Sequence, residues 1–253
     1  SVWFATVEHQ LAAEPLGRSR IDAVAEALDA HTARHGALPC PADGRLPAGH
    51  ADAGRALADG GGACTVPAAD GVVPWHTLGI GRAQARDPWA HRLAYARAAV
   101  LSCDPDDGTS EPLAVLDPVT RDPAAPDGAA WVVIGRGPDG AGAFTATGER
   151  RSVPEDLPAR DLENLDGDRD YIAGYGTTEL GDDRVVWRDT GRAIPLMCPP
   201  DLIRGEGPVR QAGVAVRNVR PAPLGELVLV ARPGLGRGTV RLPAVPTAPA
   251  AAP

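Results

Sequence analysis

The stretch RSRIDAVAEALDAHTARH, residues 18–35, decides the fold. Its apolar residues Ile21, Val24, Ala25 and Leu28 follow steps of three and four, and alanines fill the positions around them. This spacing places the apolar side chains on one face of a helix, and alanine is the strongest helix former. Gly36 suits a left-handed helix end. The pattern therefore predicts an amphipathic helix that ends at Gly36.

The chain upstream of this stretch also favours a helix. Residues 2–13 are compatible with helical structure, whereas Pro15 and Gly17 are predicted to break or kink the helix between the two parts. We therefore expect residues 1–36 to form an N-terminal helical segment.

Short apolar strands dominate the rest of the chain. Residues 129–134 (AAWVVI) form the clearest buried strand, and residues 184–188 (RVVWR) predict another. A helix followed by many short strands favours an α+β fold with an N-terminal helix packed on an antiparallel β-sheet. We expect a loop-rich globular domain over 37–198. Residues 199–253 are predicted to form a C-terminal extension with strands at 213–219 and 226–231 and an Ala/Pro-rich tail.

Composition excludes several classes of function. All 25 basic residues are Arg, which excludes a phosphate-binding P-loop lysine and a Schiff-base lysine. The net charge of −8 argues against nucleic acid as a partner. Charge is also uneven, because residues 1–200 carry −12 and the remainder carries +4. No run of 18 apolar residues, the length needed to span a bilayer, occurs in this sequence.

Two short motifs resemble catalytic or binding signatures. Residues 135–140 (GRGPDG) match the dinucleotide pattern, but Pro-Asp-Gly and the glycines that follow are typical of a turn. His31 and His35 have the spacing of metal ligands, although Thr32 stands where a metalloprotease needs Glu, and a solvated helix end explains them better. No G-x-S-x-G nucleophile motif occurs. We therefore predict that the protein is not an enzyme, and a metal-dependent hydrolase using His31, His35 and acidic residues is the weakest alternative.

The four cysteines are too widely spaced for a zinc ribbon. Disulfides in an oxidising compartment suit a loop-rich chain of this kind, and three pairings are open. We favour Cys40–Cys64, which closes a glycine-rich loop, together with Cys103–Cys198. Four buried free thiols are the alternative.

Oxygen-bearing side chains alternate around Gly167 and predict a metal site. Calcium prefers oxygen ligands, and the candidate ligands are Asn164, Asp166, Asp168 and Asp170. An EF-hand loop needs oxygen ligands at its first and last positions, and the residues at those positions here cannot supply them. The site would therefore be of another kind, with Glu163, Asp182 or Asp183 as further ligands. The alternative is an exposed acidic turn without an ion.

Several segments together resemble the periplasmic part of type IV pilin-like proteins, which include type II secretion pseudopilins and minor pilins. The resemblance covers residues 18–190. It rests on the order of GALPCPAD (36–43), GVVPWHTLG (71–79), DPWAHRLAY (87–95), WVVI with its GPDG turn (131–140), ENLDGD (163–168) and DDRVVW (182–187).

This resemblance implies a long N-terminal helix on an antiparallel sheet and a non-catalytic structural role in a secretion or pilus filament. It implies other pilin or pseudopilin subunits as partners, calcium as a ligand in some members, and a periplasmic location with an inner-membrane anchor. That anchor is a membrane-spanning half-helix absent from this sequence, and residues 198–253 have no counterpart. The alternative function is a secreted or surface calcium-dependent binding or adhesion module.

Overall fold

The computed structural model describes residues 2–60, 62–104, 108–174 and 181–198. The chain divides into two units, Ser1–Ile203 and Arg204–Pro253. The described residues belong to the first unit, so the predicted strands at 213–219 and 226–231 lie outside them.

The first element is one continuous helix, α1 (Val2–His35). The predicted break at Pro15 and Gly17 is therefore wrong. A proline removes one backbone hydrogen bond, and the apolar contacts of the following turns hold the helix in place. Gly17 is buried, and a Cβ added there would lie 3.4 Å from the ring of Pro88, which is an ordinary van der Waals distance, so α1 packs against that loop at this point. Gly36 ends the helix with a φ of 63°, as predicted.

The predicted α+β class is confirmed. Five strands form an antiparallel sheet in the order β1-β2-β3-β5-β7: β1 (Ala42–Asp43), β2 (Gly71–Val72), β3 (Ala94–Arg97), β5 (Ala129–Gly135) and β7 (Arg184–Asp189). Two further strands, β4 (Ala114–Leu116) and β6 (Asp170–Ile172), pair in parallel. The short helices are η1 (Ala68–Asp70), α2 (Trp75–Leu78), α3 (Ala159–Glu163) and α4 (Thr190–Met197).

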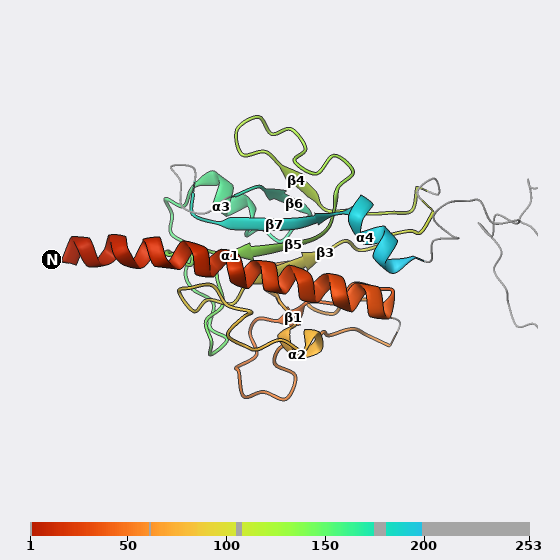
Figure 1. Ribbon diagram of the computed structural model, residues 1–253, viewed down its shortest axis with the longest axis horizontal. Helices are drawn as coiled ribbons and strands as arrows, with labels where there is room; N and C mark the ends of the chain where they lie inside the picture. Colours follow the sequence, from red (N-terminus) through yellow and green to blue (C-terminus); the bar gives the residue numbers. More distant parts are fainter. Residues whose placement is uncertain (1, 61, 105–107, 175–180, 199–253) are drawn as a thin grey trace, which may run out of the picture. The chain divides into compact units, whose positions relative to one another are not determined.

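Strand β5 is buried along its whole length because both faces of the sheet are covered. On one face, Trp131 and Val133 pack with Val24 and Leu28 of α1. On the other face, alternate residues of β5 pack with β4 and β6, in a cluster that includes Val132, Ile134, Val115 and Tyr171. Figure 1 shows α1 lying along the sheet and its first turns extending beyond it.

The strands predicted at 129–134 and 184–188 correspond to β5 and β7. Both predicted disulfides are present, with Cα–Cα distances of 5.3 Å for Cys40–Cys64 and 5.7 Å for Cys103–Cys198. The alternative of free thiols is therefore wrong for this structure.

Candidate functional site

Three aspartates come together beside α3. Asp161 lies in the first turn of α3, and Asp182 and Asp183 directly precede β7. Each of the three side chains has an oxygen within 4.8 Å of the others, and we call them the aspartate triad. Asp161 and Asp183 are 3% and 2% exposed, and Asp182 is half-buried. Within the described residues, no other group of three His, Cys, Asp or Glu side chains is as close.

The antiparallel register of β5 and β7 positions one side of the site. Gly135 pairs with Arg184, so the residue after β5 lies beside the residues before β7. As a result, Arg136 reaches Asp183 over 47 residues of sequence and donates from Nη1 to Asp183 Oδ2 at 2.9 Å. Its Nη2 donates to the carbonyl of Asn164 at 2.7 Å, which ties the strand end to α3.

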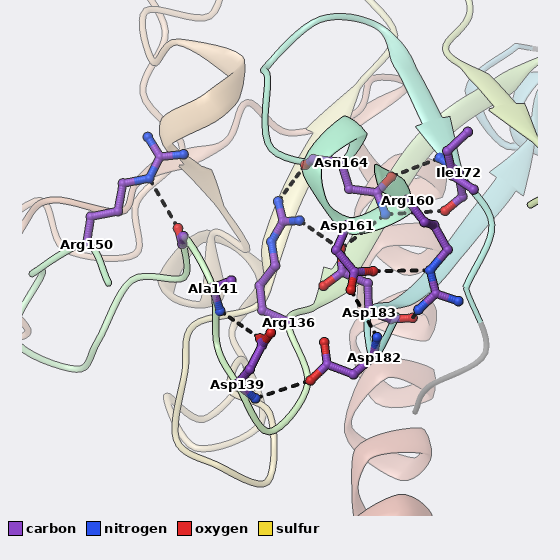
Figure 2. A network of polar contacts seen from close by, with 11 residues as sticks. Arg136, Asp139, Ala141, Arg150, Arg160, Asp161, Asn164, Ile172, Asp182 and Asp183 are labelled. Carbon is purple, nitrogen blue, oxygen red and sulfur yellow. Dashed lines mark hydrogen bonds and ion pairs between the residues drawn. The ribbon is translucent and has the colours of Figure 1, made fainter. Parts of the chain in front are cut away.

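A second arginine and an amide complete the network (Figure 2). Arg160 donates from Nε to Asp161 Oδ1 at 3.1 Å. Asn164 donates from Nδ2 to Asp183 Oδ2 at 3.1 Å, and its Oδ1 accepts from the backbone of Ile172 at 2.8 Å. Both arginines are 6% exposed, so two buried cations offset part of the charge of the triad.

Burial shifts the titration of the acids. The pKa of Asp182 is raised to about 7, mainly by burial and in part by the nearby charges of Asp139, Asp161 and Asp183, against one backbone hydrogen bond from Asp139. Burial also raises the pKa of Asp183 to about 6, although Arg136 opposes the shift. Asp182 and Asp183 therefore lose their protons less readily in this site than they would in water.

Two observations fit a bound cation. Asp182 Oδ1 is buried and has no hydrogen-bond partner, whereas its Oδ2 accepts from the backbone of Asp139 at 3.2 Å. Gly137 and Gly181 bring backbone close to the triad, since a Cβ on either would lie 2.3 Å from the Asp182 or Asp161 carboxylate. Three carboxylates supply the oxygen ligands that Ca²⁺ and Mg²⁺ prefer. The triad could therefore bind a metal ion.

The four predicted calcium ligands are divided between this network and an exposed loop. Asn164 belongs to the network, but its oxygen is used by Ile172. Asp166 and Asp168 each cap the backbone two residues on, at 3.1 and 2.7 Å, and Asp170 begins β6; all three are exposed. The structure joins the predicted helpers Asp182 and Asp183 to Asp161, a residue that the sequence analysis missed.

The other motifs have structural explanations. Residues 137–140 form a turn, as predicted, in which Gly137 and Gly140 have positive φ and face Asp182 and His91. The rings of His31 and His35 lie 4.2 Å apart at the end of α1, and His31 Nδ1 is buried without a partner.

Comparisons with known proteins do not assign this chain to a family. No family of known proteins, no curated protein and no solved structure matches this chain. What is shown is an N-terminal helix packed on an antiparallel sheet, with two disulfides of the kind found in extracellular or periplasmic domains. Among the described residues, no helix is long and apolar enough to cross a membrane.

Proposed function

We propose that this chain is a structural subunit, a pseudopilin or minor pilin, of a type II secretion or type IV pilus filament. It acts without catalysis, it lies in the periplasm or on a surface filament, and its partners are other pilin or pseudopilin subunits. When full length, it is anchored in the inner membrane by an N-terminal helix upstream of this sequence.

The observation that carries the proposal is the form of α1. A helix of 34 residues is about 50 Å long at 1.5 Å per residue. Its second half is fixed to the sheet by Ile21, Val24 and Leu28, which are at most 3% exposed. Its first turns extend beyond the sheet (Figure 1). A rod held at one end by a globular domain leaves the other end for packing against the same rods of neighbouring subunits.

The disulfides and the charge support this assignment. Cys40–Cys64 and Cys103–Cys198 favour an oxidising compartment such as the periplasm. The net charge of −8 disfavours binding to nucleic acid.

The test uses the unprocessed gene product. We expect about 20 apolar residues upstream of Ser1, enough to cross a bilayer, preceded by a short basic leader. Photo-crosslinking in the native host should join the protein to filament subunits, and removal of the upstream segment should abolish the cross-links. A full-length protein that lacks such a segment, or that is never found with filament subunits, would refute the proposal.

The aspartate triad favours a second candidate, a secreted or surface calcium-dependent binding module. Two of its acids, Asp161 and Asp183, are buried, and Asp182 Oδ1 lacks a partner, so calcium would order this end of the sheet. Surface binding that is lost on chelation, in a protein that forms no filament contacts, would support this candidate over the first.

A further inference from the structure

Two histidines lie one helical turn apart at the end of α1. His31 and His35 are separated by four positions of a continuous helix, so both side chains lie on the same side of it. Their ring centres are 4.2 Å apart, and the ring planes are inclined by 35°. The fold therefore brings two imidazoles together, and we call them the histidine pair.

A solvated helix end explains only one member of the histidine pair. His35 is exposed, as a side chain in the last turn of a surface helix is expected to be. His31 is half-buried, and its Nδ1 atom is buried without a hydrogen-bond partner among the described residues. Buried polar atoms are nearly always paired in folded proteins, so an unpaired imidazole nitrogen requires an explanation. The protein holds an imidazole here whose bonding capacity its own groups do not use.

Packing fixes the backbone that carries the histidine pair. The hydroxyl of Thr32, which is 1% exposed, donates to the carbonyl of Leu28 at 2.7 Å. A Cβ added to Gly36 would lie 3.4 Å from the backbone oxygen of Met197, the last residue of α4, and Figure 1 shows α4 beside this end of α1. The last turn of α1 is therefore held from its buried side. Two ligands on a fixed turn lose little conformational freedom when they bind an ion.

The chemistry of the histidine pair differs from that of the aspartate triad. Imidazole nitrogen is a ligand for Zn²⁺, Ni²⁺ and Cu²⁺, whereas Ca²⁺ and Mg²⁺ prefer oxygen. Ring nitrogens four residues apart on a helix have the spacing at which two histidines share one such ion. A ligating imidazole must be neutral, and burial lowers the pKa of His31 below its ordinary value. The two sites would therefore select different classes of cation.

We propose that His31 and His35 bind one divalent transition-metal ion of the zinc, nickel and copper class through one nitrogen of each ring. Water completes the coordination, and the ion links two successive turns at the end of α1. No hydrolysis is assigned to it, because Thr32 occupies the position of a metalloprotease glutamate and its hydroxyl is already bonded to Leu28. This site does not depend on the filament role.

The test measures metal binding to the full chain with its disulfides intact. Cu²⁺ added in less than equimolar amount at pH 7.5 should give an electron paramagnetic resonance spectrum with coupling to two nitrogens. The aspartate triad offers only oxygen ligands, so nitrogen coupling distinguishes the two sites. Exposed His35→Gln should reduce the coupling to one nitrogen. It should also weaken Zn²⁺ binding, measured by calorimetry, about a hundredfold, because the second ligand of a linked pair is lost.

Two controls separate the pair from histidine content and from folding. Ala33→His with His35→Gln keeps the number of histidines but places them two residues apart, on different faces of the helix, and should bind as weakly as His35→Gln alone. His76→Gln removes an exposed histidine elsewhere and should bind like the unaltered protein. Melting temperatures in chelator should agree between His35→Gln and the unaltered protein. Full affinity in His35→Gln or in the spacing variant, or a Cu²⁺ spectrum without nitrogen coupling, would overturn the proposal.

Discussion

The two faces of the sheet are stabilised by different means. Beneath α1, Val24 and Leu28 pack on Trp131 and Val133 in an apolar cluster, and charged groups lie only at its border, where the guanidinium of Arg188 lies over the ring of Trp131. On the opposite face, the apolar cluster around Val132 and Tyr171 adjoins buried acids and arginines beside α3. The first face depends on apolar area removed from water, whereas the second depends on charges that must compensate one another. The comparison therefore predicts different responses to truncation, pH and metal.

Truncation on the α1 face should have the largest effect. Trp131 is 1% exposed, and the guanidinium of Arg188 lies 5.5 Å from its ring centre. Trp131→Ala should lower the free energy of unfolding by about 3–5 kcal/mol, measured by urea denaturation. Trp187→Ala is the matched control on the other face, where the ring is half-buried, and should cost about 1–2 kcal/mol. Equal costs would contradict the comparison.

Breaking an ion pair on the other face should lower the free energy of unfolding by nearly as much. Arg136→Met leaves Asp183 buried without its cation and should cost about 3 kcal/mol at pH 7.5. The loss should shrink towards pH 5, because Asp183 then takes up a proton. Arg150→Met, which removes a surface contact to Asp70 at 3.5 Å, should cost less than about 1 kcal/mol. A loss of stability that does not depend on pH would show that packing, and not charge, stabilises this end of the sheet.

The sequence predicted the α1 face well and the charged face poorly, for a physical reason. The spacing of apolar residues at 21–28 and the apolar run AAWVVI each indicate which side chains are buried. Both segments lie in the core of the structure. The pairing of Cys40 with Cys64 could likewise be proposed from the loop that it closes.

The charged face depends on contacts distant in sequence. Arg136 meets Asp183 only because β5 and β7 pair in one register, and no local pattern reports that register. A run of acids such as Asp166–Asp170 has the same sequence pattern whether its side chains are exposed or buried, so the sequence does not indicate which it is. Asp161, in contrast, is buried and carries no signature beyond its place in a short helix. Continuity of α1 through Pro15 was missed because tertiary contacts outweigh a local preference.

Titration of the triad gives a third, smaller effect. The pKa of Asp182 is about 7 when folded, against an ordinary value near 3.8, so the folded state binds the proton more tightly. The stability contributed by this proton is complete below pH 4 and is lost as pH rises through 7, in chelator-treated buffer. Asp182→Asn should remove this loss and stabilise the protein at pH 8 by about 2 kcal/mol, after allowance for solvent screening. Melting temperatures from pH 4 to 8 test it, with exposed Asp122→Asn as the control; parallel curves for Asp182→Asn and wild type would contradict it.

Metal binding should give the smallest effect and should locate the site. At pH 8, calcium at ten times its dissociation constant should stabilise the protein by about 1.4 kcal/mol, seen as a rise in melting temperature. If the ion lies in the aspartate triad, Asp182→Asn abolishes the rise, because Asp182 Oδ1 is the triad oxygen without a partner. If it lies in the exposed loop before β6, Asp166→Asn with Asp168→Asn abolishes it and Asp182→Asn leaves it intact. An unchanged melting temperature would mean that Arg136, Arg160 and the proton on Asp182 together compensate the negative charge of the aspartate triad. Neither face of the sheet would then need a bound ion for its stability.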